Sequence, residues 1–397
     1  MSRWRSLLRV FGVGTSVGRS PFEPRQRPES RDPGLEDPDA YFLASSSQLV
    51  WRAFRKHKLA MFGLAVLGVL YFVAIFASFF APYDAWERQS GYVTAPPTVV
   101  RFVHDGRLHW PFVYGTESSL NLETLAREYA IDRDQVYRLQ WFVKTEPYDL
   151  FGILPVDRRF VGVEDGGQLF LFGTDSLGRD VFSRVLQGAR ISLSIGLIGV
   201  AISFLLGITL GGISGYFGGT VDMVIQRIIE FLGQLPHIPL WMALAAAVPT
   251  EWPPVRVYFM ITLVLSILGW TGLARTVRGK ILQLRSEDYV MAARFAGASQ
   301  FSIIRKHLLP GFASYLIIHI TLAIPEMILG ETALSFIGVG LKAPVVSWGV
   351  MLQEAQNVRT VAVNPWLMLP AAFVIVTVLC YNFVGDGLRD SADPHSN

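Results

Sequence analysis

Long apolar segments alternate with polar ones along most of this chain. A bilayer core about 30 Å thick needs roughly 20 consecutive apolar residues in a helix. Six segments approach that length, namely residues 59–80, 191–213, 223–248, 257–274, 312–337 and 366–383. The pattern therefore predicts an all-α integral membrane protein with six transmembrane helices.

The second and third segments each carry a special feature. Glycines punctuate residues 191–213, and small residues let helix backbones approach closely in lipid. Residues 223–248 are instead interrupted by Arg227, Glu230, Pro236, His237 and Pro239. We expect the third segment to be kinked, or to begin in the cytoplasm, because proline and charged groups are poorly tolerated inside a span.

Basic residues lie beside the first span and between the fourth and fifth. They are Arg52, Arg55, Lys56, Lys58, Arg275, Arg278, Lys280, Arg285, Arg294, Arg305 and Lys306. Such residues favour the cytoplasmic side of a bacterial membrane. With six crossings, residues 1–58 and 386–397 become cytoplasmic tails. Residues 81–188 become an insertion on the outside, and residues 189–385 form the remaining membrane core.

Composition agrees with this class of protein. Hydrophobic residues make up 51% of the chain and charged residues 17%, and the mean hydropathy is +0.37. These values are too apolar for an ordinary soluble protein. A net charge of +3 gives no support for nucleic-acid binding. Residues 1–39 lack the apolar core of a signal peptide, and we expect them to be a disordered cytoplasmic tail.

The sequence offers no pattern for catalysis or metal binding. Cys380 is the only cysteine, so neither an internal disulfide nor a thiolate metal site is expected. The histidines show no paired ligand spacing, and neither a GxSxG nor a GxxxxGK[ST] motif occurs. We therefore expect no enzyme activity, no metal and no cofactor bound by this chain itself.

The insertion differs from the spans in its mixed charge and many aromatic residues. Asn121 is a candidate N-cap for a helix over residues 122–142. Residues 160–172 alternate around a Gly-Gly turn and predict a β-hairpin. The insertion should therefore be a small α+β appendage. It could act as a lid or spacer, or as a docking surface for a delivery protein.

The loop of residues 286–310 carries soluble-type helix signals between two spans. Ser286 is a candidate N-cap, and Glu287 and Asp288 place negative charge at the start of a helix. Gly297 permits a sharp break, and Ser299 can begin a second helix. That second helix would present Phe301, Ile304 and Leu308 as an apolar stripe and end at Pro310. Two short helices around a glycine suggest a rigid docking knob. The alternative is a helix lying on lipid headgroups.

Ionisable groups within spans are candidates for a transport path. They are Glu230, His237, Glu326 and Glu331. A polar network that fastens helices together, or a position at the outer membrane interface, is the alternative and the favoured interpretation. Asp175, Arg179 and Asp180, before the second span, could likewise form a local loop clamp or contact substrate.

The loop closely resembles the coupling loop of ATP-binding-cassette importer permeases. Ala292, Ala293, Gly297, Leu309 and Pro310 match the family's positions, whereas the family's glutamate falls on Met291. Further matches are FGTDSLGRDVFSRVLQGARISL, GYFGGTVD, WTGLARTVRGKIL, ETALSFIGVGL, SWGVMLQEAQ, PWLMLP and GDGLRDSADP. Together they resemble inner-membrane permeases for dipeptides, oligopeptides and nickel, in the subunit type with a GTD motif after the first span.

The resemblance implies half of a translocation path in a bacterial inner membrane. A second permease, two ATPase subunits that bind ATP and Mg, and an outside substrate-binding protein would be its partners, besides membrane lipid. Peptides are the leading cargo, with oligosaccharides next and nickel behind them. A membrane receptor or sensor, or an intramembrane enzyme, is the different-class alternative. A receptor would need a cytoplasmic output domain, and an enzyme would need clustered catalytic groups.

Overall fold

The structure is a computed structural model that describes residues 46–104, 106–120, 122, 127–150, 153–249 and 251–392. The expected disordered tail (1–39) and the candidate cap Asn121 lie outside these residues. The described residues from Val50 onward belong to one compact unit.

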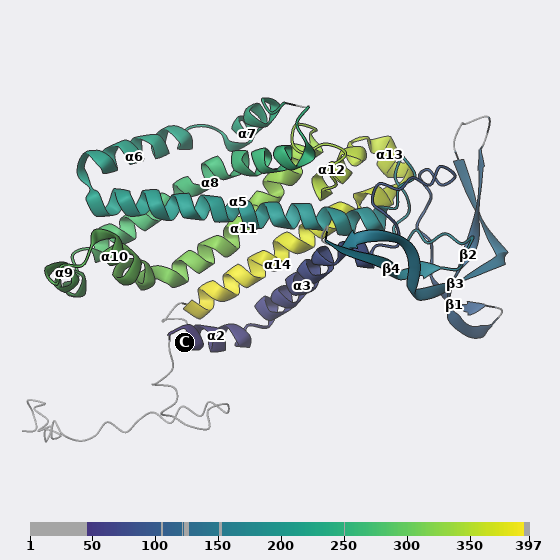
Figure 1. The fold of residues 1–397 in the computed structure, drawn as a ribbon, viewed down its shortest axis with the longest axis horizontal. Helices are drawn as coiled ribbons and strands as arrows, with labels where there is room; N and C mark the ends of the chain where they lie inside the picture. Colours follow the sequence, from purple (N-terminus) through teal and green to yellow (C-terminus); the bar gives the residue numbers. More distant parts are fainter. Residues whose placement is uncertain are drawn as a thin grey trace, which may run out of the picture. The chain divides into compact units, whose positions relative to one another are not determined.

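Helices make up the membrane part of the unit (Figure 1). The longer ones are α2 (Ser46–Lys56), α3 (Lys58–Ile75), α5 (Val181–Phe217), α6 (Gly219–Gly233), α7 (His237–Ala246), α8 (Pro254–Leu284), α11 (Ala313–Phe336) and α14 (Leu369–Ala392). Short helices α4 (Ala77–Phe80), α12 (Trp348–Gln353) and α13 (Val358–Val363) lie near their ends. A run of 3₁₀ helix at Pro365–Met368 leads into α14, and a second at Glu354–Gln356 follows α12.

Five helical runs in the described residues are long and apolar enough to cross a membrane. They correspond to predicted spans one, two, four, five and six. The predicted third span is broken into α6 and α7, which meet at 88° and give a sixth crossing only if the pair counts as one span. The break falls at Leu235–Pro236, where proline removes a backbone donor. The expectation of a kink is therefore confirmed.

Glycines bring α5 and α8 into close, parallel contact. A Cβ built at Gly207 would lie 2.8 Å from Leu273, and one at Gly211 would lie 2.5 Å from the Ala274 carbonyl oxygen. Because a membrane supplies little hydrophobic drive between helices, such backbone approach is a main source of helix association there. On the other side of the bundle, Gly63 of α3 packs in the same way against the backbone of α14.

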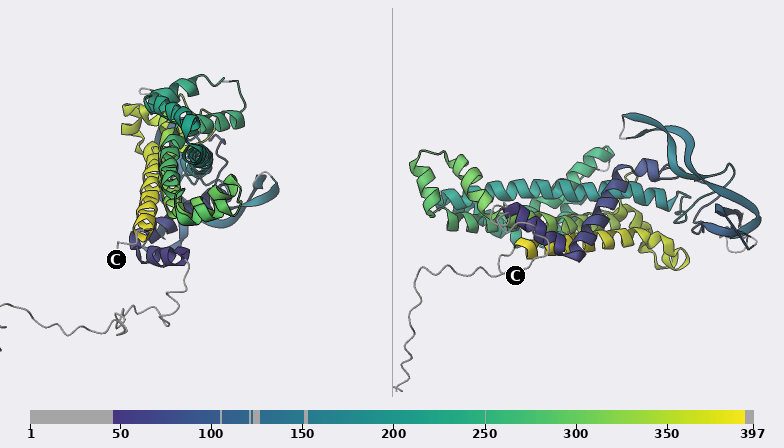
Figure 2. Two further views of the ribbon diagram at one scale, coloured as in Figure 1. Left: turned by 90° about the vertical axis from the view of Figure 1, so that its left-hand side faces the viewer. Right: turned by 90° about the horizontal axis from the view of Figure 1, so that it is seen from below.

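A four-stranded antiparallel sheet occupies the segment between the first two spans. Its strands are β1 (Arg101–His104), β2 (Arg107–Leu120), β3 (Arg127–Leu150) and β4 (Leu154–Val163), in that spatial order. Val113, Leu139, Val161 and Leu169 form its small core. In Figures 1 and 2 the sheet lies at one end of the helices, and the segment of residues 286–310 lies at the other.

The predicted helix over residues 122–142 is wrong, because residues 127–150 form the long strand β3. Its first half pairs with β2, from Leu120 opposite Arg127 to Phe112 opposite Arg138. The local sequence is rich in aromatic and β-branched residues, which suit a pleated surface. Pairing with the preceding strand decides the structure here, so the described insertion is a sheet rather than α+β.

The predicted hairpin over residues 160–172 is only half right. Gly166 has a φ of +90°, and the Gly167 amide donates to the Glu164 carbonyl at 3.0 Å, so the Gly-Gly turn is present. Residues 168–171 form no strand, however, and β4 pairs with the second half of β3 instead. Helix α5 also begins at Val181, seven residues before the expected end of the insertion at residue 188.

Candidate functional site

The loop of residues 286–310 starts with helix α9 (Asp288–Phe295). Its N-cap is Glu287 rather than the predicted Ser286, whose hydroxyl donates to the Gln283 carbonyl instead. Glu287 makes no side-chain cap. Asp288 lies in the first turn, where a carboxylate is favoured by the helix dipole.

Helix α9 ends in a tight glycine turn. Gly297 has a φ of +80°, and its amide donates to the Arg294 carbonyl, while the Ala298 amide donates to the Ala293 carbonyl, both at 3.1 Å. This pair of bonds is the Schellman arrangement, which needs a left-handed residue at the glycine position. The predicted break at Gly297 is confirmed, together with its conformational reason.

A second helical segment follows at once. The Ser299 hydroxyl accepts the Ser302 amide at 3.3 Å and caps α10 (Gln300–Ile303), as predicted. The turn continues as a π-helix over Ile304–Leu308 and a 3₁₀ helix over Leu309–Phe312, which contains Pro310. The two segments thus form the compact pair of short helices that the sequence predicted.

One side of this loop packs against α8, and the other side is exposed. Val290, Ile303 and Leu308 are buried against Leu273, Val277 and Ile281 of α8. Phe295 and Phe301 are 85% and 71% exposed. Of the predicted stripe, Phe301 is presented to the outside, whereas Leu308 is buried and Ile304 is half-buried. Phe295 was not singled out from the sequence, although its place two residues before Gly297 was a usable signal.

The residues predicted for this loop lie on both of its segments. Ala292 and Ala293 are on α9, and Leu309 and Pro310 are in the 3₁₀ helix that leads into α11. Ala292 is exposed, whereas Ala293 packs against the buried side. The exposed rings of Phe295 and Phe301 project from a loop whose buried side is fixed to α8. Such rings are suited to filling a hydrophobic groove on another protein.

A buried charge cluster lies at the opposite end of α5. Asp175 accepts from the Arg179 Nε at 2.7 Å and from the Arg184 Nη1. Glu354 accepts from the Arg179 Nη2 at 3.2 Å. These four residues, here named the clamp, tie the start of α5 to the 3₁₀ turn after α12. The predicted local pair Asp175–Arg179 is confirmed, but Arg184 and the distant Glu354 complete it.

Asp180 is not part of the clamp, contrary to the local pairing considered for it. Its Oδ2 accepts the Ser183 amide at 2.7 Å and caps α5. Its Oδ1 is buried and has no hydrogen-bond partner among the described residues. Burial raises the pKa of Asp180 to about 7, against the opposing effect of the hydrogen bond from Ser183.

Glu331 lies fully buried on α11 among three hydroxyl groups. Ser347, Ser335 and Ser192 donate to its carboxylate at 2.6, 2.8 and 3.2 Å. Ser192 belongs to α5, and Ser347 caps α12. The carboxylate therefore joins three helices from inside the core.

The other three candidate path residues lie elsewhere. Glu230 is exposed on α6 and pairs with Arg227 at 3.0 Å. His237 is the first residue of α7, and its ring centre lies 5.9 Å from that of Trp241. Glu326 lines a cavity of about 100 Å³ with His319 and Ser203. The structure does not bring the four together, and the path role of each stays a prediction.

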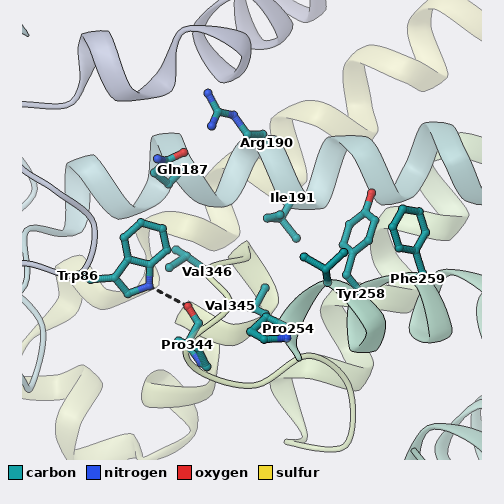
Figure 3. Close-up of a pocket in the computed structure, with 11 residues that line it drawn as sticks. Trp86, Gln187, Arg190, Ile191, Pro254, Tyr258, Phe259, Pro344, Val345 and Val346 are labelled. Atoms are coloured by element: carbon teal, nitrogen blue, oxygen red, sulfur yellow. Dashed lines mark hydrogen bonds between the residues drawn. The ribbon is translucent and has the colours of Figure 1, made fainter. Parts of the chain in front are cut away.

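A larger apolar cavity of about 540 Å³ opens at the sheet end of α5 and α8. Figure 3 shows Ile191, Pro254 and Tyr258 along it, with the Trp86 indole donating to the Pro344 carbonyl at 2.8 Å. The lining is almost wholly apolar. A cavity of this character accepts an apolar side chain or an acyl chain rather than a charged group.

Two family models match the chain. Residues 207–396 match the "Binding-protein-dependent transport system inner membrane component" family, and residues 45–97 match the "N-terminal TM domain of oligopeptide transport permease C". Long apolar helices, the glycine-turned loop and these matches define a multi-pass transport permease of the inner membrane, rather than an enzyme.

Two curated relatives from Bacillus subtilis align over most of their length. The dipeptide transport system permease protein DppC is 33% identical over 352 residues, which is 88% of this chain and 86% of the relative. The oligopeptide transport system permease protein OppC is 30% identical over 361 residues, which is 90% and 93%. The chain belongs to this family of inner-membrane permeases of binding-protein-dependent transport systems.

Proposed function

We propose that the chain is the permease subunit of a peptide importer driven by ATP, and that it forms half of the translocation path. Relatives named for dipeptide and oligopeptide transport support the choice of peptides over oligosaccharides or nickel. ATP and Mg bind to two ATPase partners, and this chain needs no cofactor of its own. The observation that carries the proposal is the rigid loop with exposed Phe295 and Phe301.

The loop docks one ATPase subunit on the cytoplasmic side. Its buried residues pack on the last turns of α8, so a push on the loop acts directly on a membrane helix. The basic flanks argue that both chain termini share this side. The sheet then lies outside, where it helps a substrate-binding protein deliver cargo.

The second permease packs on the faces of α6 and α8. Val255, Phe259, Leu263 and Ile267 recur every four residues along α8 and are all exposed. Met223, Val224 and Phe231 are exposed on α6. Four-residue spacing places side chains on one helix face, and a neighbouring helix bundle would cover this face in the assembled importer.

Replacing both exposed rings with serine tests the docking. In the importer assembled from this chain and its partners, the F295S/F301S variant should lose the ATPase subunits on purification and show no stimulated ATP hydrolysis. Each lost ring removes about 1.5–3 kcal/mol of apolar burial. The control is L108S, since Leu108 is also 85% exposed but lies on the sheet. Normal assembly and hydrolysis in F295S/F301S would refute the docking role.

Gly297 supplies an independent test of the loop's shape. No atom lies within 4 Å of a Cβ built there, so any effect comes from the backbone conformation alone. G297V should uncouple hydrolysis from uptake, whereas G297N should retain coupling because asparagine tolerates a positive φ better than valine. Equal uptake by the two variants would show that the glycine turn is not required.

A further inference from the structure

The first span carries its outward-facing apolar residues right up to the sheet. On α3, Leu59, Phe62, Val69 and Phe72 are all exposed, while Ala60, Gly63 and Leu67 are buried in the bundle. The exposed stripe is the face that lipid would cover. The Phe72 ring meets the Phe80 ring edge to face, with ring centres 5.9 Å apart, and Phe80 is the last helical residue before the polar segment.

Aromatic rings from the sheet continue this stripe. The ring centre of Phe160 in β4 lies 5.9 Å from that of Phe79 and 5.3 Å from that of Phe80. The ring centre of Phe142 in β3 lies 6.2 Å from that of Phe79. The Arg159 Nη1 donates to the Ala81 carbonyl at 2.9 Å, just after the helix ends. The ribbon formed by residues 139–150 of β3 and by β4 is thus joined directly to the end of the span.

Two neighbouring aromatic residues of this ribbon remain about half exposed. Trp141 is 45% exposed and Phe142 is 55% exposed. Phe142 also has a φ of +57°, a conformation that costs a bulky residue roughly 1–3 kcal/mol. Nothing in the described sheet offsets this cost by burying the ring. Aromatic side chains of this kind are typical of the boundary between lipid and water.

A pair of basic residues lies next to these rings. Lys144 and Arg158 are register partners on β3 and β4, and both are exposed. No ion pair joins either of them to a carboxylate among the described residues. Like charges directly opposite each other destabilise a sheet. An anionic group placed over the pair removes that repulsion, and the phosphate groups of lipids are the anions that a bilayer surface supplies.

We propose that the ribbon rests in the membrane surface beside the end of the first span. Trp141 and Phe142 enter the interface between headgroups and acyl chains, and Lys144 and Arg158 bind the phosphates of anionic lipids. Because the ribbon adjoins the end of α4, it lies at a bilayer surface in either orientation of the chain. It assigns the base of the insertion to the bilayer and leaves the distal strands β1 and β2 free for other contacts.

Spin labels at two positions test the proposal in the full chain, reconstituted in vesicles that contain phosphatidylglycerol. In a C380S background, one label is placed by F142C and the other by L108C on the distal hairpin. At position 142, collisions with oxygen should exceed collisions with a soluble nickel chelate severalfold, and at position 108 the order should reverse. Equal access of the nickel chelate to both sites would overturn the proposal. Protection of position 142 from both reagents would also overturn it, in favour of a protein contact.

Charge reversal tests the lipid phosphates separately. With the label at position 142, K144E/R158E should move the label towards water in phosphatidylglycerol vesicles but have little effect in phosphatidylcholine vesicles. The charge-neutral control K144Q/R158Q should shift it less. An identical label depth in the variant and the parent would refute the phosphate contact. A response of the parent to inorganic phosphate in phosphatidylcholine vesicles would assign the pair to a soluble anion instead and would also refute it.

Discussion

Removing the charge of Asp175 should destabilise the membrane bundle severely. In the clamp, Asp175 and Glu354 balance Arg179 and Arg184, and the side chains of Asp175 and Arg184 are each only 4% exposed. The D175N variant keeps the shape of the side chain but leaves one buried positive charge without compensation. The new amide group also presents N–H donors to two guanidinium groups that can only donate.

The expected loss is about 3–5 kcal/mol, the usual result of breaking a buried ion pair from one side. Glu354 provides the internal comparison, because its side chain is 25% exposed and water screens it. E354Q should therefore cost only about 1 kcal/mol. D165N is the matched control, since Asp165 is exposed in the turn after β4.

Cys380 provides the assay. This single cysteine is only 3% exposed in α14, so a thiol-reactive dye reports its exposure when the bundle unfolds on heating. The midpoint for D175N should fall on the order of 5–10 °C below the parent. If D175N and D165N unfold at the same temperature, the clamp contributes no net stability and the reasoning is wrong.

Three further predictions follow from close packing, titration and topology. A Cβ at Gly211 would clash with the Ala274 backbone, whereas no atom lies within 4 Å of a Cβ at Gly272. G211L should therefore lower the stability of the bundle by about 1–3 kcal/mol or more, and G272L should not. The thiol-reactive dye on Cys380 measures both. The pKa of Asp180 is raised to about 7 in the native state, so the native state binds one more proton than the unfolded state between about pH 4 and 7. Stability should therefore fall as the pH rises through this range. Melts followed by tryptophan fluorescence should show this dependence, and D180N should abolish it. In whole cells an impermeant thiol reagent should label S119C but not Q300C, and the reverse pattern would invert the proposed orientation.

Local signals in the sequence were sufficient wherever the decisive contact is near in the chain. Gly297 and Ser299 act within a few residues, and the structure confirms both as a helix stop and a helix cap. Asp175 and Arg179 are only four residues apart in the loop before α5, so their pairing was also predictable. The broken third span follows from Pro236, whose effect on the backbone is equally local.

Distant contacts decided the features that were missed. Residues 127–138 became a strand because β2 pairs with them, and no spacing within the segment shows that partner. Glu354 joins the clamp from 175 residues beyond Arg179. The exposure of Phe301 depends on which neighbour α8 buries. In each case the contact is a property of the tertiary structure, whereas the sequence pattern carries only the tendency.

The arrangement of α5 and α8 suggests how the two ends of the molecule act together. Helix α8 ends at Leu284, four residues before α9, and holds the loop through Leu273, Val277 and Ile281. Its close backbone contact with α5 at Gly207 and Gly211 leaves no room for sliding without side-chain strain. Helix α5 in turn begins at the clamp. A displacement of the loop should therefore move α5 and α8 together as one rigid body, so that the end of α5 nearest the sheet moves as far as the loop does. The clamp must then either move with α5 or lose its contact with Glu354.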